Sequence, residues 1–317
     1  MDANIEQAIK LFRDGAYSEA FEKSIEILTL DFTSKYPQYI AIAVIKGTQG
    51  NLAKFLLQRW IEGCHFGNLS NAALIIRDTF DDSDVYLMSS SLAGIAANLG
   101  DHVSALELFG NCLTEDLSVS LSKQDVVQEY EQEATIYDSQ PVHCESINDF
   151  MEFLGRSLGP AGDMTVIDIP CGTGQAGTLL RPWAAWLIGS DLSPDMLACA
   201  EATGSYDQLI CGDLFDILPG LSANMVVCLG SLYYFQDLDP VVAAAVAALQ
   251  PGGYFAFTDF PASRGVMRTI GGNMRYCRAP ALVRETLAAH NFIEVSAEFG
   301  QSFGLLCIYW LFRKGPS

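Results

Sequence analysis

Residues 166 to 177 read VIDIPCGTGQAG and join an apolar run, an acid and a glycine-rich turn. A turn of this kind between a strand and a helix presents backbone N–H groups at the helix N-terminus, where polar or anionic ligands bind. The stretch therefore predicts the first strand, turn and helix of a parallel α/β sheet. The rest of the chain can be placed relative to this turn.

Downstream of Met164, short apolar runs alternate with helix-like segments. The runs are MTVIDI, WLIGS, QLICG, MVVCLGS, YFAFTDF, FIEVSAEF and LLCIYWLF. This alternation is typical of a parallel sheet with helices on both faces. No helix separates the last two runs, so we expect a closing hairpin that places one antiparallel strand in the sheet. The sequence thus predicts an α/β fold with a Rossmann-like, seven-stranded, mostly parallel sheet.

The first part of the chain, residues 1–115, has helical periodicity and almost no β-type alternation. A glycine followed five positions later by an alanine recurs at Gly15, Gly67 and Gly100. The stretches GAYSEAFEKSIEIL and GDHVSALELFGNCL resemble tetratricopeptide repeats, in which a turn glycine and a small residue let two helices cross closely. We expect an all-α, tetratricopeptide-like domain for recruitment or self-association, with a plain helical bundle as the alternative.

The boundary between the two parts is expected in a polar, weakly periodic stretch. Residues 114–124 read TEDLSVSLSKQ, which is typical of a linker. The second domain is therefore expected to span residues 125–317.

Composition excludes several classes of function. The formal net charge is −20, and basic residues do not cluster, so neither nucleic acid nor an anionic membrane is an expected partner. The nine cysteines lack the spacing of a zinc site, and we expect no metal. The N-terminus lacks the pattern of a signal peptide, and no apolar stretch is long enough for a membrane span, so a cytoplasmic location is expected.

The glycine-rich turn is compatible with more than one ligand. Gly172, Gly174 and Gly177 match G-x-G-x-x-G, and Asp191 follows at the end of the second strand, as in nicotinamide-dinucleotide-binding proteins. The turn alone is also compatible with a tight connection that binds nothing. Asp168 and Asp213 add carboxylates at the ends of the first and third strands. Three acids at successive strand ends suit a cationic, amino-acid-bearing nucleoside better than a diphosphate.

Several segments together carry a family resemblance. DIPCGTG, GSDLSPDMLACA, YDQLICGDL, LQPGGYFAFTDF and MRYCRAPALVRETLAAHNF are similar to class I S-adenosylmethionine-dependent methyltransferases, most of all to predicted ones with N-terminal tetratricopeptide repeats. The resemblance covers about residues 125–300 and implies S-adenosyl-L-methionine as the cofactor. It implies the following binding residues: Asp168, Gly172 and Gly174 for the methionine portion, Asp191 for the ribose, Asp213 and Leu214 for the adenine, and Leu229 and Gly230 for the sulfonium side, with Pro170 and Leu192 as further cofactor-binding residues.

Pro170 departs from the family pattern, because it stands where the first motif glycine is usual. A proline has a fixed φ and no N–H, which suits an extended residue. We expect a modest change in the shape of the turn and intact cofactor binding.

The acceptor should lie over the ends of the fourth and fifth strands, between Tyr233, Tyr234, Asp259 and a loop that holds Arg275 and Tyr276. Arg275 offers an anchor for an acceptor carboxylate or phosphate, or else balances charge in an acidic protein. The tyrosines offer a hydroxyl for proton transfer or orientation, or else pack above the cofactor. The sequence contains no decisive general base.

These observations predict a methyltransferase that acts on a small-molecule acceptor, which Arg275 would bind if the acceptor is anionic. Three alternatives remain open at this point. The acceptor is a protein that docks on the helical repeats; the chain is an NAD-dependent oxidoreductase; or the second domain is a non-catalytic nucleoside-binding scaffold.

Overall fold

The fold was analysed in a computed structural model. It describes residues 3–30, 40, 41, 44, 82–98, 100–133, 137–139, 141–159, 162–270, 274–302 and 305–316. The chain divides into two compact units, Met1–Cys112 and Leu113–Ser317. Each unit is described by itself.

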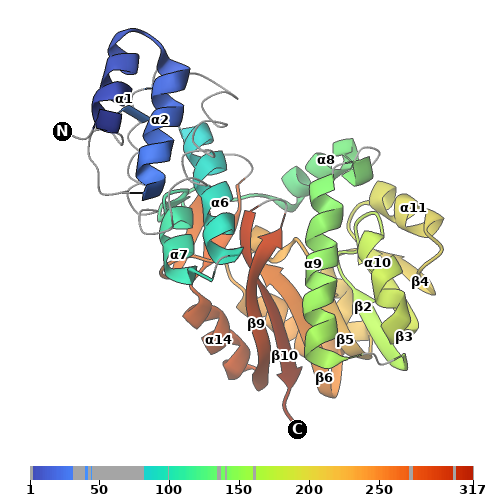
Figure 1. The fold of residues 1–317 in the computed structure, drawn as a ribbon. Helices are drawn as coiled ribbons and strands as arrows, with labels where there is room; N and C mark the ends of the chain where they lie inside the picture. The colour runs from blue at the N-terminus through green and yellow to red at the C-terminus, as the bar shows by residue number, and fades with distance from the viewer. Residues whose placement is uncertain are drawn as a thin grey trace. The chain divides into compact units, whose positions relative to one another are not determined.

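The described regular structure of the first unit is helical (Figure 1). Its longer helices are α1 (Ala3–Arg13), α2 (Tyr17–Leu30), α6 (Asp82–Asn98) and α7 (His102–Gly110). Helix α1 contacts α2, and α6 contacts α7. Gly15 and Gly100 connect these pairs with φ values of +79° and +80°, a conformation that glycine adopts without steric cost.

The small residues predicted at the helix crossings are buried. Ala20 and Ala105 have no exposed surface, as expected where two helices approach closely. The third predicted repeat position, at Gly67, lies outside the described residues. Assignment to the tetratricopeptide repeats therefore stays a prediction.

The second unit contains the predicted seven-stranded sheet. The strands are β2 (Met164–Asp168), β3 (Ala184–Asp191), β4 (Gln208–Cys211), β5 (Ala223–Cys228), β6 (Leu249–Asp259), β9 (Phe292–Ser302) and β10 (Leu305–Lys314). Their order is β4-β3-β2-β5-β6-β10-β9. Strand β10 pairs antiparallel with both β6 and β9, while the other strand pairs of this sheet are parallel, which confirms the predicted closing hairpin. Strand β2 lies between β3 on one side and β5 on the other, so the strand order reverses at β2. Such a switch point opens a crevice at the carboxyl ends of the strands.

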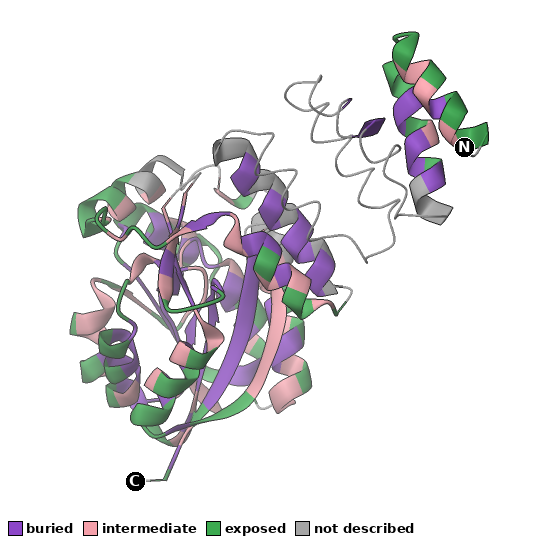
Figure 2. Ribbon diagram, turned by 90° about the vertical axis from the view of Figure 1, so that its left-hand side faces the viewer, coloured by how far each residue is buried: buried purple, intermediate pink, exposed green. Residues whose placement is uncertain are grey.

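Helices cover both faces of this sheet (Figure 1). Helix α9 (Pro141–Leu158) packs on β9 and β10, and α10 (Gln175–Leu180) packs beside it. Helix α11 (Pro194–Ala202) contacts β3 and β4, while α13 (Asp239–Ala248) and α14 (Pro280–Ala289) contact β6 and β9 respectively. The central strands are therefore buried along most of their length (Figure 2).

Aromatic side chains fill both layers of the core. On α9, Phe150 and Phe153 lie 5.4 and 5.7 Å from Tyr309 of β10, measured between ring centroids. On the opposite face, Phe257 stacks on Phe312 at 6.0 Å. Burial of large side chains on both sides fixes the sheet and hence the edge at which its strands end.

A second, three-stranded sheet differs from the sequence prediction. Strand β1 (Leu113–Thr114) pairs with β7 (Val266–Thr269), which pairs with β8 (Tyr276–Arg278). The loop predicted to hold Tyr276 is therefore a strand in that region, because its backbone pairs with β7. The polar stretch predicted as a linker, 114–124, begins inside this sheet and leads into α8 (Lys123–Glu133).

One aromatic ring explains the glycines around the first turn. A Cβ atom on Gly189 would lie 2.7 Å from the ring of Tyr206, and a Cβ atom on Gly177 would overlap that ring. A Cβ atom on Gly174 would lie 3.1 Å from the same ring and 2.9 Å from the backbone of Ala200. Gly174 and Gly177 of the pattern, and Gly189 of β3, are thus required by packing against Tyr206, whereas a Cβ atom on Gly172 would meet nothing within 4 Å.

Replacing Gly177 with alanine should lower the free energy of unfolding by roughly 1–3 kcal/mol, because the new methyl group overlaps the Tyr206 ring. Gly220→Ala is the matched control, since a Cβ atom there meets nothing within 4 Å. That variant should stay within about 0.5 kcal/mol of the wild type. Denaturant unfolding followed by tryptophan fluorescence measures both. Equal stability of the two variants would contradict the packing role of Tyr206.

Candidate functional site

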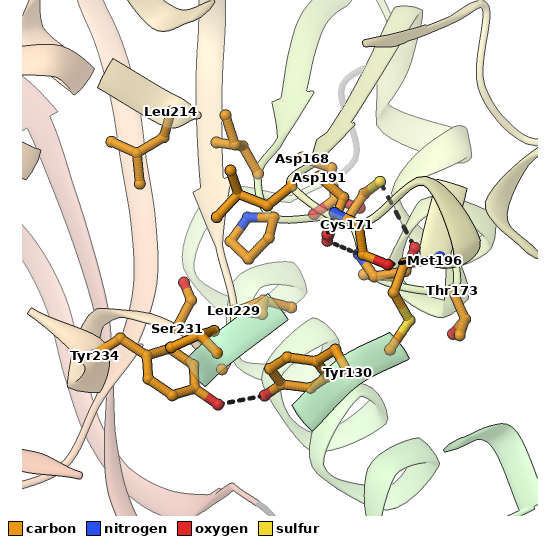
Figure 3. A pocket seen from close by; sticks show the side chains of 18 of the residues that line it. Tyr130, Asp168, Cys171, Thr173, Asp191, Met196, Leu214, Leu229, Ser231 and Tyr234 are labelled. Atoms are coloured by element: carbon orange, nitrogen blue, oxygen red, sulfur yellow. Dashed lines mark hydrogen bonds between the residues drawn. The ribbon is translucent and has the colours of Figure 1, made fainter. Parts of the chain in front are cut away.

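A cavity of about 340 Å³ opens at the carboxyl ends of β2, β3, β4 and β5 (Figure 3). Its position matches the switch point of the sheet. Of the cofactor-binding residues expected from the sequence, the following line it: Asp168, Pro170, Gly172, Asp191, Leu192, Asp213, Leu214, Leu229 and Gly230. Gly174 lies outside the lining, directly at the N-cap of α10 with a φ of +87°.

Asp168 ends β2 and is fully buried. Its Oδ2 accepts a hydrogen bond of 2.7 Å from the hydroxyl of Tyr206, while its Oδ1 is buried without a hydrogen-bond partner. Burial raises the pKa of this carboxyl to about 7; the bond from Tyr206 lowers it and the neighbouring Asp191 raises it. A buried carboxylate oxygen without a partner is unfavourable until a cation or donor reaches it.

Asp191 ends β3 and lies across the first turn from Asp168. Its Oδ2 accepts a 2.9 Å bond from the backbone N–H of Gly172, and its Oδ1 accepts one of 2.9 Å from Ser193. Burial raises the pKa of Asp191, and these backbone donors act against that rise. The carboxylate therefore ties the turn after β2 to the turn after β3 and holds a fixed orientation in the cavity wall.

Asp213 follows β4 and caps the short helix α12 (Leu214–Ile217). Its Oδ1 accepts a 2.9 Å bond from the N–H of Phe215, and its Oδ2 forms an ion pair with Lys123 at the start of α8. The ammonium of Lys123 also lies 5.8 Å from the centroid of the Phe215 ring. The third acid predicted from the sequence thus has an internal partner.

Helix α8 forms a wall of the cavity that the sequence analysis did not assign to the site. Lys123, Val126, Val127 and Tyr130 contribute to the lining, as do Ile147 and Phe150 of α9. The hydroxyl of Tyr130 lies 2.6 Å from that of Tyr234, so α8 is joined to the segment after β5 (Figure 3). The aromatic Tyr130 and the apolar Val126 and Val127 on a mostly polar helix were the available signal, but periodicity does not reveal which cavity a helix covers.

A side chain from another element also holds the glycine-rich turn after β2. The side chain of Asp138, in the short helix η1 (Tyr137–Ser139), accepts bonds of 2.6 Å from Thr173 Oγ1 and from Gln175 Nε2. Gly230 is fixed on the other side of the cavity, where its N–H donates a 2.9 Å bond to Thr258 Oγ1. Both flanks of the cavity are therefore held by side chains from other elements.

Among the predicted acceptor-side residues, Tyr234 lines the cavity, whereas Tyr233, Arg275 and Tyr276 lie outside its lining. The guanidinium of Arg275 lies over the rings of Tyr233 and Tyr234, 5.0 and 4.6 Å from their centroids. Arg275 and Tyr276 are buried, at 8% and 2% exposure. Arg275 is therefore buried and packs against both tyrosine rings.

Asp259 was also expected to face the acceptor, and the structure gives it a different partner. Its Oδ1 accepts a 2.8 Å bond from Arg278, and both side chains are almost fully buried. The second guanidinium nitrogen of Arg278 donates to the carbonyl oxygen of Leu232 at 3.2 Å. This pair joins β6, β8 and the segment after β5, which is a structural role.

Comparisons with known proteins agree with this geometry. Residues 167–257 match the family model described as a methyltransferase domain. A ubiquinone biosynthesis O-methyltransferase from Methylococcus capsulatus is 33% identical over 115 residues, which cover 34% of this chain and 48% of that protein. A second curated match, an uncharacterised RNA methyltransferase from Chlamydia trachomatis, is 31% identical over 67 residues, 21% of this chain and 16% of that protein. The chain thus spans less than half of the length of these relatives.

The fold is similar to that of a solved structure. The [4+2]-cyclase SpnF superposes with a TM-score of 0.51 at 16% identity, covering 62% of this chain and 98% of SpnF. The 1,6-didemethyltoxoflavin-N1-methyltransferase from Burkholderia thailandensis gives 0.49 at 18% identity, covering 61% and 86%. Together with the family match, the observed sheet defines a class I methyltransferase fold. The family match bears out S-adenosyl-L-methionine as the cofactor expected from the sequence.

None of the described helices has the length and apolar character needed to cross a bilayer. No group of three or more histidine, cysteine or acidic side chains suited to a metal ion occurs in the described parts of the chain.

The buried Asp168 gives the protein a specific pH dependence. Its folded pKa of about 7 lies above the ordinary 3.8, so its contribution to stability is fully present below about pH 3.8 and lost as pH rises to about 7. Relative to Asp168→Asn, the unliganded wild type should lose roughly 2–4 kcal/mol of unfolding free energy between pH 4 and 7, then remain level.

Urea unfolding at a series of pH values measures this difference. Asp207→Asn is a control of opposite sign, because hydrogen bonds from Arg181 and from the Leu187 N–H lower the pKa of Asp207. Its contribution should be lost as pH falls. A wild type that gains stability over Asp168→Asn as pH rises would show that Asp168 is not destabilised by burial.

Proposed function

We propose that the second unit is an S-adenosylmethionine-dependent methyltransferase that acts on a small-molecule acceptor. One observation supports it most: the cavity at the switch point is lined by Asp168 and Asp191, and Asp168 retains a buried oxygen without a partner. A cationic ligand compensates for the cost of burying such a carboxylate. The cofactor is a cationic nucleoside that carries an ammonium group.

The donor groups of the cofactor correspond to the acids of the site. Asp168 would accept from the ammonium through Oδ1, since Oδ2 is bonded to Tyr206. Asp191 would accept from the ribose hydroxyls, because each carboxylate oxygen retains a lone pair beyond its bond to a backbone N–H. Asp213 would accept from the adenine amine, provided that Lys123 shares or releases it. Leu192, Leu214 and Leu229 would supply apolar walls.

The bound cofactor supplies an activated methyl group on its sulfonium. The residues of this chain then have to orient the acceptor and exclude water. Tyr234, Tyr130 and Phe150 line the cavity beside Leu229 and Gly230, where the acceptor would enter. Burial raises the pKa of Tyr234, and the neighbouring Tyr233 raises it further. The hydroxyl therefore keeps its proton near neutral pH and would orient the acceptor rather than deprotonate it.

The acceptor side of the cavity changes one expectation. Arg275 was expected to bind an anionic acceptor, but it stacks on Tyr233 and Tyr234 outside the cavity lining. We therefore propose an acceptor recognised by aromatic and hydroxyl groups, with Arg275 holding the tyrosine rings in place. The curated relative with the name of a ubiquinone biosynthesis O-methyltransferase supports a small-molecule acceptor.

The alternatives differ in their ligands. The turn with Asp191 also suits NAD, whose two phosphates would lie close to the carboxylates of Asp168 and Asp191. A protein acceptor docked on the helical unit, or a scaffold that binds a nucleoside without turnover, would leave the cofactor site unchanged. Formation of S-adenosylhomocysteine from a pool of small metabolites separates the proposed activity from these two.

Isothermal titration calorimetry with S-adenosylmethionine and with NAD tests the ligand. The wild type should bind S-adenosylmethionine in the micromolar range. Asp191→Asn should weaken this binding by about 1–3 kcal/mol, because the charge that accepts from the ribose is removed. Glu201→Gln, on the exposed side of α11, should bind like the wild type. Binding of NAD alone would refute the proposal and favour an oxidoreductase.

A second prediction concerns the acceptor. Tyr234→Phe should leave the affinity for S-adenosylmethionine unchanged and lower kcat/KM for the acceptor about tenfold, because it removes a hydroxyl that bonds to Tyr130 and lies on the acceptor side of the cavity, away from the acids proposed to hold the cofactor. Initial rates of S-adenosylhomocysteine formation measure the effect. Tyr254→Phe, at the opposite end of the sheet beside Pro251 and Gly252, is the matched control. A Tyr234→Phe enzyme with wild-type rates would place the acceptor elsewhere.

A further inference from the structure

Tyr206 lies outside the cavity lining, and the sequence analysis gave it no role in the site, although it begins the segment YDQLICGDL. It stands in the connection between α11 and β4, directly before Asp207. Its ring occupies the space beneath Gly174, Gly177 and Gly189, as described above. The position of this ring therefore determines where its hydroxyl can reach.

The hydroxyl donates its 2.7 Å hydrogen bond to Oδ2 of Asp168. A carboxylate that is held at one oxygen has a fixed plane, so the direction of its second oxygen is fixed as well. That second oxygen, Oδ1, is the buried atom without a partner. The two oxygens of Asp168 therefore differ: Oδ2 is bound to Tyr206, whereas Oδ1 remains available to a ligand.

The groups that face Asp168 come from four elements. They are Tyr206 before β4, Asp191 at the end of β3, Cys171 in the turn after β2, and Cys228 at the end of β5. Burial raises the pKa of both thiols, which are neutral near pH 7. Burial and the neighbouring Asp168 also raise the pKa of Tyr206, which keeps its proton and can only donate to this carboxylate. Asp191 is the other anion of this group, and it repels charge on Asp168.

We propose that Tyr206 is a positioning residue for the cofactor: its hydroxyl holds Asp168 so that Oδ1 receives the ammonium group of the methionine portion. This inference rests on the proposed function, since it concerns the same ligand. Tyr206 acts through Asp168 and does not touch the ligand. The same bond favours the charged form of the carboxylate, which a cationic ligand requires.

The test measures binding by calorimetry between pH 5.5 and 7.5 for the wild type and Tyr206→Phe. The phenyl ring keeps the packing beneath the glycines and removes only the donor. S-adenosylmethionine should bind about tenfold more weakly to the variant at pH 7. The pH at which affinity reaches half of its plateau should also move upward, because the carboxylate ionises less readily without its donor. The ligand's own amine titrates identically in both proteins.

A second ligand distinguishes positioning from general support of the turn. 5′-Methylthioadenosine has the nucleoside but lacks the amino-acid portion, so its affinity should be within twofold in the two proteins and show no shifted midpoint. In the Asp168→Asn background, Tyr206→Phe should cause no further loss of S-adenosylmethionine affinity, since the two residues act as a unit.

Three results would overturn the inference. They are unchanged S-adenosylmethionine affinity in Tyr206→Phe, equal weakening for 5′-methylthioadenosine, and additive losses in the double variant. If the wild type bound 5′-methylthioadenosine and not S-adenosylmethionine, the proposed function would fail together with the role of Tyr206. Failure of Tyr206 alone, with intact wild-type binding, would leave the proposed function in place.

Discussion

Asp168 is a carboxylate with no exposed surface at the end of the central strand β2, and the rest of the site is arranged around the cost of burying it. Desolvation disfavours its charged form, and the single bond from Tyr206 offsets only part of that cost. Under the proposed function, a cationic ligand compensates for this cost. The proposed ligand therefore explains both the buried acid and the cavity beside it.

Tyr206 connects the backbone pattern with this chemistry. Its ring requires glycine at Gly177 and Gly189, and its hydroxyl contacts Asp168. A glycine-rich turn is usually explained by the approach of a ligand to the backbone. In this chain the same glycines also admit an aromatic side chain from a neighbouring connection. Packing and ligand binding are therefore coupled through one residue.

The sequence was sufficient to predict the sheet and the acids at its edge. Each of the seven apolar runs became a strand. The inner strands such as β5 and β6 are mostly buried and therefore have an apolar signature, whereas the edge strands β4 and β9 are mostly half-buried or exposed. Asp168, Asp191 and Asp213 were found because parallel strands end at one edge. The pairing of β1 with β7, and hence the strand around Tyr276, was not predicted, because contacts distant in sequence leave no periodic signal.

The remaining misses have the same cause. The position of helix α8 over the cavity was not predicted, because it depends on the pair Tyr130–Tyr234, which joins residues far apart in the chain. Arg275 was expected to face the acceptor, because a cation near aromatic residues suggests an anion site. The structure instead uses its guanidinium to stack on Tyr233 and Tyr234.

A crystal structure of the protein with S-adenosylhomocysteine bound tests the central claim most directly. The account predicts the ammonium group within hydrogen-bond distance of Asp168 Oδ1, the Tyr206 hydroxyl still on Oδ2, and the ribose hydroxyls on Asp191. A ligand bound at another place, or bound in this cavity with its ammonium directed away from Asp168, would contradict it.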